Sequence, residues 1–383
     1  MIQKIVWSFC LVWVVLGSGC GKKSRMPDMQ GAKILSIDVE HDIKTESDFV
    51  NALDSVRFII IKDSAVVGIS KVVAYNDCYY ILDRTQNVVS VLDGDGNLKY
   101  RLSRKGRAKH EYLEISDFTV SGEKLTVYDQ SAMRMIDYDI STGIYMSSFD
   151  VQDIYSNVCR IDNNLLVAYS SYGLSTAENK MLAVFDSSVV DRYIEKPFFL
   201  NERINIEQSS PVSRYMDRMY VTPLFSDFIY SVDSDSVKSR YYIDFGKYQL
   251  PERFYRRVDN EDSNKMLSDI YKSDYAHNVD HFIETKDYIY FIFAYHLDDY
   301  SVYYNKKTSK CLLFIKTAFG EDTRIWACNN HVSNTETDFV SWLYLANVQD
   351  DVESPNPILQ KLIGIASEAG GRYEFAIAVY KFK

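Results

Sequence analysis

The chain has 383 residues, of which 46% are hydrophobic and 14% aromatic, with 30 Tyr and 20 Phe. This composition supports a substantial core, so it excludes an intrinsically disordered chain, and the many aromatic residues favour β-strands. The formal net charge is −10 and no long basic run is present, which argues against nucleic-acid binding, because phosphate contacts need a concentrated basic surface.

The N-terminal segment is typical of a bacterial export signal. Lys4 supplies a positive charge, and the apolar run 5–16 is too short to span a bilayer comfortably. The small residues 17–19 before Cys20 resemble the lipobox of bacterial lipoproteins. That resemblance implies a signal peptide over residues 1–19, its removal, and lipid attachment at Cys20. An ordinary secretory signal and an uncleaved anchor are the alternatives.

Residues 20–32 are polar and predict a flexible tether. Gly21, rather than Asp, follows the cysteine, and by resemblance to Gram-negative sorting signals this favours the outer membrane. Lys22 and Lys23 stand where some surface-displayed lipoproteins carry acidic residues. We therefore expect the protein to face the periplasm, with surface exposure as the alternative.

The stretch 91–99, VLDGDGNLK, spaces its acidic residues like a calcium loop. An EF-hand loop that began at Asp93 would need Gly at its sixth position and Glu at its twelfth. Leu98 and Arg104 occupy those positions, so this loop type is ruled out. The flanking segments are strand-like and the middle is rich in Asp, Gly and Asn, so the stretch predicts a β-hairpin turn.

A repeat becomes visible when strands that end in Asp are aligned. Such strands end at Asp93, Asp139, Asp186 and Asp233, at intervals of 46–47 residues. A period in the mid-forties, with about four short strands per unit, is the signature of a β-propeller blade. One four-stranded sheet cannot bury both faces, whereas blades packed around an axis cover one another.

The repeat therefore predicts an all-β chain that forms a six-bladed β-propeller of four-stranded antiparallel blades, as one domain over residues 33–383. N-terminal strands within 34–61 are expected to close the ring with the last blade. The blades are expected at residues 68–102, 112–149, 158–199, 212–245, 279–317 and from 325 onward.

The sequence predicts two helical segments. The period lengthens after the fourth blade, and we expect a helical insertion at residues 250–277, with Met266, Leu267 and Ile270 as its packing face. A further helix is expected over residues 357–366, before Gly370 and the last strand.

The segment 79–129 resembles the six-bladed β-propeller lipoproteins of Gram-negative bacteria, which are similar in shape to NHL-type propellers. In that family a loop of the form G-x-G-P-x-E-Y leads into an Asp-Phe strand. This chain matches that pattern at Gly106, Glu111, Tyr112, Asp117 and Phe118, whereas Ala108 and Lys109 replace the second Gly and the Pro. Segment 241–254 and the Asn-Pro pair at 356–357 also resemble the family. The resemblance implies the fold and the envelope location, and no shared active site.

No nucleophile elbow, zinc-protease, phosphate-loop or dinucleotide motif is present. His277 and His281 are four residues apart with Asp280 between them, but this segment passes from the insertion into a strand, so we expect no metal site there. Lactonase-type propellers hold calcium with Glu, Asn and Asp at the channel mouth, where Glu114, Asn157 and Asp280 are candidates.

The innermost strand of each blade lines the channel, and ligands usually bind at its mouth. The polar residues on the expected inner strands are candidates for a channel-mouth binding set: Lys71, Glu114, Arg214 and His281. The alternative is that they are channel walls or salt bridges between blades. The wide spacing of the four cysteines outside the export signal leaves disulfides or free thiols open; these are Cys78, Cys159, Cys311 and Cys328.

These patterns favour a lipid-anchored envelope propeller that acts as a non-catalytic binding or scaffolding module for a protein or a glycan. The alternative is a metal-dependent hydrolase, lactonase or lyase with its site at the channel mouth. We assign no catalytic residue and expect no cofactor, with a channel calcium as the alternative. We further expect a monomer that contacts the membrane only through its N-terminal lipid and binds no nucleic acid.

Overall fold

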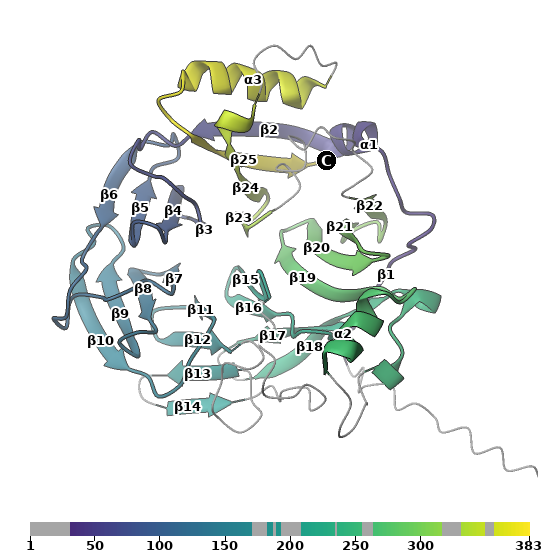
Figure 1. Cartoon of the computed structure of the whole chain (residues 1–383), viewed down its shortest axis with the longest axis horizontal. Helices are drawn as coiled ribbons and strands as arrows, with labels where there is room; N and C mark the ends of the chain where they lie inside the picture. The colour runs from purple at the N-terminus through teal and green to yellow at the C-terminus, as the bar shows by residue number, and fades with distance from the viewer. Residues whose placement is uncertain are drawn as a thin grey trace, which may run out of the picture.

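The computed structural model describes residues 31–170, 182–186, 189–192, 208–233, 236–254, 263–315, 331–348 and 356–383. These residues form six sheets around a central axis, so the predicted six-bladed β-propeller is confirmed (Figure 1). In blades one to five the strands follow one another from the axis to the rim. The predicted signal peptide and most of the predicted tether lie outside the described residues.

The strands of each blade are given from the axis outward. Blade one contains β3 (Lys71–Tyr75), β4 (Cys78–Asp83), β5 (Val88–Leu92) and β6 (Leu98–Leu102); blade two contains β7 (Asp117–Ser121), β8 (Lys124–Asp129), β9 (Arg134–Asp139) and β10 (Tyr145–Asp150). Blade three contains β11 (Asn157–Arg160), β12 (Leu165–Tyr169), β13 (Leu182–Asp186) and β14 (Val189–Arg192); blade four contains β15 (Val212–Tyr215), β16 (Arg218–Val221), β17 (Phe228–Val232) and β18 (Val237–Asp244). Blade five contains β19 (His277–Glu284), β20 (Tyr288–Tyr295), β21 (Asp298–Asn305) and β22 (Cys311–Ile315); blade six contains β23 (Ser333–Asn334), β24 (Phe339–Tyr344), β25 (Phe375–Phe382) and β2 (Leu53–Ile60).

Aspartates at the ends of strands stabilise the turns of the blades by accepting backbone hydrogen bonds. At the end of β4, the carboxylate of Asp83 accepts hydrogen bonds from the backbone N–H groups of Val67 and Gln86, at 2.9 and 3.0 Å. Asp129, at the end of β8, accepts equivalent bonds within blade two. Each aspartate therefore ties the segment that enters its blade to a turn inside that blade.

The hairpin turn predicted for the DGDGN stretch is confirmed between β5 and β6. Oδ1 of Asp93 accepts hydrogen bonds from the N–H groups of Asp95 and Asn97, both at 2.9 Å. Gly96 has a φ of +79°, and a Cβ atom there would collide with the carbonyl oxygen of Ile60 on β2. The turn thus needs glycine both for its backbone conformation and for its contact with blade six.

The N-terminal segment closes the ring and also covers part of its rim. β2 pairs with β25 in antiparallel fashion, as predicted. β1 (Lys33–Ser36) instead pairs in parallel with β18 and forms a fifth strand on blade four, so the expectation that the whole segment 34–61 closes the last blade is wrong for β1. The reason is burial, because the Leu35 side chain lies fully inside the core between blades four and five. Further on, Ile43 forms a bridge with Leu313 on β22.

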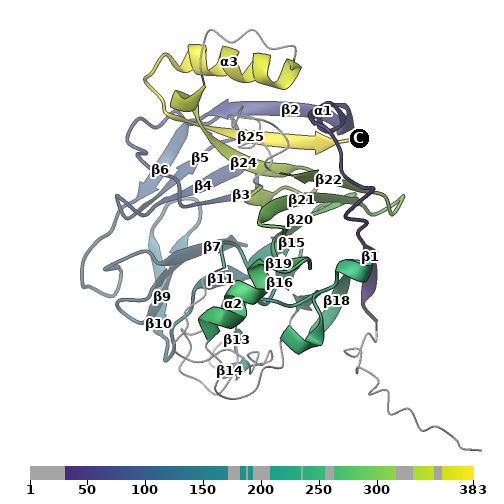
Figure 2. The same cartoon turned by 45° about the vertical axis from the view of Figure 1, so that its right-hand side comes forward.

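The described residues include three α-helices outside the sheets: α1 (Glu46–Ala52), α2 (Ser263–Tyr271) and α3 (Pro357–Ala369). The predicted last helix is confirmed as α3, which packs against β2 at the rim of blade six (Figures 1 and 2). The insertion contains α2, and Met266 and Ile270 are buried as predicted, against Leu224 and Phe225 of blade four. No helix in the described part of the chain is long and apolar enough to cross a membrane.

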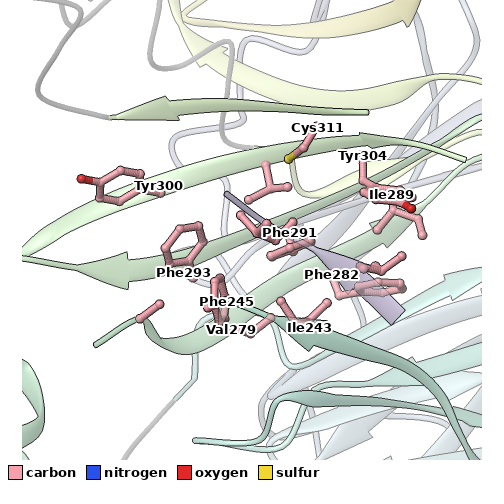
Figure 3. Packing of buried hydrophobic residues seen from close by; sticks show 14 of the residues in the cluster. Ile243, Phe245, Val279, Phe282, Ile289, Phe291, Phe293, Tyr300, Tyr304 and Cys311 are labelled. Carbon is pink, nitrogen blue, oxygen red and sulfur yellow. The ribbon is translucent and has the colours of Figure 1, made fainter. Parts of the chain in front are cut away.

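The cores lie between neighbouring blades. Between blades four and five, side chains from β18 and the segment after it interdigitate with those of β19, β20 and β21 (Figure 3). The rings of Phe245 and Phe293 lie 4.7 Å apart, and Phe293 stacks on Tyr300 at 5.1 Å. This aromatic packing makes each blade depend on its neighbours for burial.

Candidate functional site

The inner strands are joined across the axis by hydrogen bonds between side chains and backbone groups. Nζ of Lys71 on β3 lies 2.7 Å from Oδ1 of Asp117 on β7, and donates to the carbonyl oxygen of Phe118 at 2.8 Å. Oδ2 of Asp117 accepts a hydrogen bond from the N–H of Val158 on β11 at 2.7 Å. Lys71 and Asp117 therefore connect blades one, two and three.

Arg214 on β15 bridges the channel from blade four. Its Nη1 donates to the carbonyl oxygen of Val120 on β7 at 2.9 Å. Its guanidinium carbon lies 5.4 Å from the ring centre of Tyr75 on β3. A charge-assisted hydrogen bond and a cation–π contact thus hold this side chain against blades one and two.

Cys159 on β11 lies near both of these cations. Burial raises the pKa of its thiol to about 11, and the positive charges of Arg214 and Lys71 oppose that rise. Lys71 and Arg214, two members of the expected channel set, therefore form one cluster with Asp117 and Cys159. Cys78, Cys159 and Cys311 are free thiols, and Cys328 lies outside the described residues.

The other two members of the expected set lie elsewhere. Glu114 is exposed in the loop before β7, where its Oε2 accepts a hydrogen bond from Oγ of Ser131 at 3.1 Å. His281 lies on β19, whose pairing with β20 shifts register on both sides of Asp280. The structure therefore brings together two of the four candidates, and it places Glu114 and His281 at separate positions.

β19 has a strained backbone. Asn278 and His281 have φ angles of +57° and +53°, which are uncommon for residues other than glycine. Between them, the carboxylate of Asp280 accepts a hydrogen bond from the N–H of Ser209 at 3.0 Å, which connects blade five to blade four. Burial lowers the pKa of His281, while the charges of Asp280 and Asp299 oppose that shift.

The histidine pair does not form a metal site in the described residues. The ring of His277 packs edge-on against Tyr271 of α2, with ring centres 5.1 Å apart, and burial lowers the pKa of His277 to about 4. The calcium candidates Glu114, Asn157 and Asp280 lie on a loop, on β11 and on β19. Within the described ranges, no three His, Cys, Asp or Glu side chains are placed to hold a metal ion.

A groove between blades two and three is the feature that sequence reasoning missed. It encloses about 800 Å³. Its apolar part contains Phe149 after the bend of β10, Phe185 of β13 and Tyr155, whose rings form a connected cluster with centres 5.8 Å apart. We call it the blade 2–3 groove. Phe149 is the most exposed of the three rings, so it can contact a bound molecule.

The polar part of the blade 2–3 groove is a buried charge network. Nη2 of Arg160 lies 2.7 Å from Oδ1 of Asp137, and Nζ of Lys124 lies 3.1 Å from Oδ2 of the same carboxylate. Nε of Arg160 donates to Oγ1 of Thr126, and its Nη1 donates to the carbonyl oxygen of Asn163. Each of the three nitrogens of Arg160 therefore donates a hydrogen bond inside the protein, whereas Lys124 keeps donors that can face the groove.

A sequence signal for this groove exists, but it is weak. Thr126 and Asp137 interrupt the apolar strands LTVYD and MIDYD at positions where a blade normally packs on its neighbour. A charged residue in the middle of a buried strand requires a partner. That partner, Arg160, is on another blade, and its identity depends on how the blades twist against each other.

Comparison with known proteins supports the fold along nearly the whole chain. The profile of the family described as "Domain of unknown function (DUF4934)" matches residues 34–370. A crystal structure of a Bacteroides fragilis protein inferred to be exported is 18% identical, covers 92% of this chain and 100% of its own, and superposes with a TM-score of 0.76. A Bacteroides vulgatus member of the DUF4221 family is 11% identical, covers 86% and 97% of the two chains, and has a TM-score of 0.52. No curated protein matches the sequence.

Proposed function

The chain belongs to the DUF4934 family, and from this premise we propose that it is a lipid-anchored envelope propeller that binds a protein or glycan partner without catalysis. The observation that carries this proposal is the blade 2–3 groove. Its volume of about 800 Å³ falls within the usual range for ligand sites. Its aromatic rings and hydrogen-bonding groups provide the two kinds of contact that a sugar or a side chain of a partner needs.

The groove is also preorganised for binding. One wall belongs to blade two and the other to blade three, and the ion pair between Arg160 and Asp137 fixes the walls to each other. Both of these side chains are almost completely buried, so the pair is screened little by salt. A rigid site loses less entropy on binding, which favours recognition.

The cluster of Lys71, Asp117, Cys159 and Arg214 in the channel also supports a non-catalytic role, because its cations are already hydrogen-bonded. Lys71 and Arg214 each donate to a carbonyl group of another blade. These bonds join blades to one another, and an engaged cation is a poor general acid or anion site until those bonds break. We therefore assign these residues a structural role and leave the binding role to the groove.

The location belongs to the same proposal. We place the protein in the outer membrane, facing the periplasm, with lipid on Cys20. The inferred export of the B. fragilis structural neighbour and the lipobox-like sequence support this location. Twelve residues separate Cys20 from β1, so the tether reaches at most about 40 Å from the bilayer.

Two experiments test the proposal: one measures binding of a partner or a glycan, and the other measures lipid attachment at Cys20. The full chain, produced in a Bacteroides host, is used to capture partners from native envelope extracts and is applied to a glycan array. F149A, which removes the exposed ring of the groove, should lose the partner or glycan signal. L297A is the matched control, because Leu297 is an exposed apolar residue on blade five, outside the groove, and it should retain the signal.

Two results would contradict the proposal. The binding role would be wrong if the wild-type chain captured no partner and bound no glycan. The anchor would be wrong if Cys20→Ala left labelling by a palmitate analogue unchanged.

A further inference from the structure

The rims of the six blades are not equally covered. β1 pairs with β18 on blade four, Ile43 bridges to β22 on blade five, and α3 packs on β2 of blade six. In the described part of the chain no further strand pairs with β10, the outer strand of blade two. β10 lies on the rim across the ring from β1 (Figure 1). Blade two therefore presents an open strand edge on the side away from the N-terminal tether.

This open edge carries apolar side chains. Ile144, Met146 and Phe149 are 60%, 44% and 36% exposed. Soluble proteins usually protect open strand edges with charged residues, because an apolar edge invites another strand. A bulge displaces Met146, and from Ser147 to Asp150 the pairing with β9 is regular. That regular part of β10 can accept backbone hydrogen bonds from an added strand.

A basic loop borders the same edge. Residues 104–110, RKGRAKH, contain four Lys and Arg residues in a chain of net charge −10. The side chains of Lys105, Arg107 and Lys109 are exposed, and none of the three has an ion-pair partner among the described residues. We call these three residues the basic triplet. Three unpaired cations on an acidic protein form a local positive field that attracts acidic groups.

The loop is held in place and joined to blade two. The N–H of Gly106 donates to the carbonyl oxygen of Tyr112, and the N–H of Tyr112 donates to that of Arg104. Nε of Arg104 donates to the carbonyl oxygen of Gly143, in the turn before β10. The hydroxyl of Tyr138 donates to the carbonyl oxygen of His110. The basic triplet and the open edge therefore belong to one continuous surface.

We propose that this surface docks an extended acidic segment of a partner protein, which adds to β10 as a fifth strand. The segment's backbone would pair with β10, its apolar side chains would cover Met146 and Phe149, and its carboxylates would face the basic triplet. The inference deepens the proposed function, on which it rests, by naming the partner class. A lipid surface fits less well. The proposed lipid on Cys20 is joined to β1, across the ring from β10 (Figure 1), so β10 would face away from the bilayer.

The test uses a fluorescein-labelled peptide that alternates glutamate with leucine or valine. Its binding to residues 21–383 is measured by fluorescence anisotropy at about 0.15 M and about 1 M salt. We expect micromolar affinity that weakens in high salt. K105Q/R107Q/K109Q should weaken binding roughly tenfold, because it removes three exposed charge pairs that each contribute modestly. K265Q/K310Q/K361Q, which neutralises three exposed lysines elsewhere, should bind like the wild type.

A second pair of peptides tests strand addition. N-methylation at alternate residues removes the backbone donors from one edge of the peptide without changing its charge. One of the two N-methylated peptides should lose binding while the other retains it. Equal binding by both would overturn strand addition. No peptide binding, or binding of vesicles of anionic phosphatidylglycerol that the peptide does not displace, would overturn the acidic-segment inference.

Envelope capture separates this inference from the proposed function. If the wild type and K105Q/R107Q/K109Q capture the same partner equally well, the proposed function stands and this inference fails. If the wild type captures nothing and binds no glycan, the proposed function itself fails.

Discussion

Replacing Asp137 with Asn should destabilise the propeller strongly, because this carboxylate lies at the centre of the buried network between blades two and three. Arg160, Lys124 and Thr126 all direct donors at Asp137, whose side chain is 3% exposed. The amide would remove the negative charge and place a donor opposite these donors. Breaking a buried ion pair on one side costs about 3–5 kcal/mol.

The expected shift in melting temperature follows from chain size. An unfolding entropy of about 2.1 cal/mol/K per residue gives roughly 0.7 kcal/mol/K for a propeller of roughly 350 residues. D137N should therefore lower Tm by about 4–7 °C in differential scanning calorimetry. The matched control is D150N on the same blade, because Asp150 is 78% exposed and pairs with Arg134 only at the surface. That change should lower Tm by about 1 °C or less.

The result that would refute this reasoning is a D137N shift as small as that of D150N. A second comparison tests the cause. In D137L/R160M the buried charges are removed together, so the double variant should be less destabilised than D137N. A double variant that is less stable than D137N would indicate that the ion pair itself, rather than the isolated charge, provides the stability.

Three further predictions test other parts of the structure. Leu35→Ala, at the buried position of β1 on blade four, should lower Tm by about 4–7 °C. Ile34→Ala, at an exposed position of the same strand, should leave Tm within about 1 °C of the wild type. Burial lowers the pKa of His277 to about 4, so between about pH 6.5 and that value the unfolded chain binds a proton that the folded chain does not, and the free energy of unfolding falls as the pH falls. H277Q should reduce the loss of unfolding free energy between pH 7.5 and pH 5 by about 2 kcal/mol in urea titrations. An unchanged loss would contradict the burial argument. Burial raises the pKa of Cys159 to about 11, so brief alkylation of the folded protein at pH 8 should label the half-buried Cys78 but not Cys159, as mass spectrometry of the peptides would test.

The fold could be predicted from the sequence because its repeat follows from local chemistry. Asp93 in blade one and Asp139 in blade two occupy equivalent places, and each carboxylate accepts hydrogen bonds from backbone N–H groups a few residues away. Asp83 and Asp129 form a second such pair. Such short-range bonds leave a regular signature along the chain. The spacing of the aspartates therefore marks four blades, and the later aromatic strands predict the other two.

The site could be predicted only in part, because it depends on contacts between distant residues. Lys71 and Arg214 are polar residues on inner strands, and that pattern predicts that they line the channel. Their shared neighbour Cys159 does not follow from the sequence, since it depends on how three blades meet at the axis. The ion pair of Arg160 with Asp137 is missed for the same reason. Likewise, β1 looks like any short strand, and only burial of Leu35 assigns it to blade four.

Blade six joins the two ends of the chain, and this has a consequence for the order in which the protein is made. β2 leaves the ribosome early, but its partner β25 begins only at Phe375. At about 5–20 residues per second, between about 15 s and about 60 s pass before β25 follows. During that interval β2 has no strand to pair with in its own blade. A chain that stops short of β25 leaves β2 unpaired within blade six and keeps an open ring, so closure of the propeller requires β25.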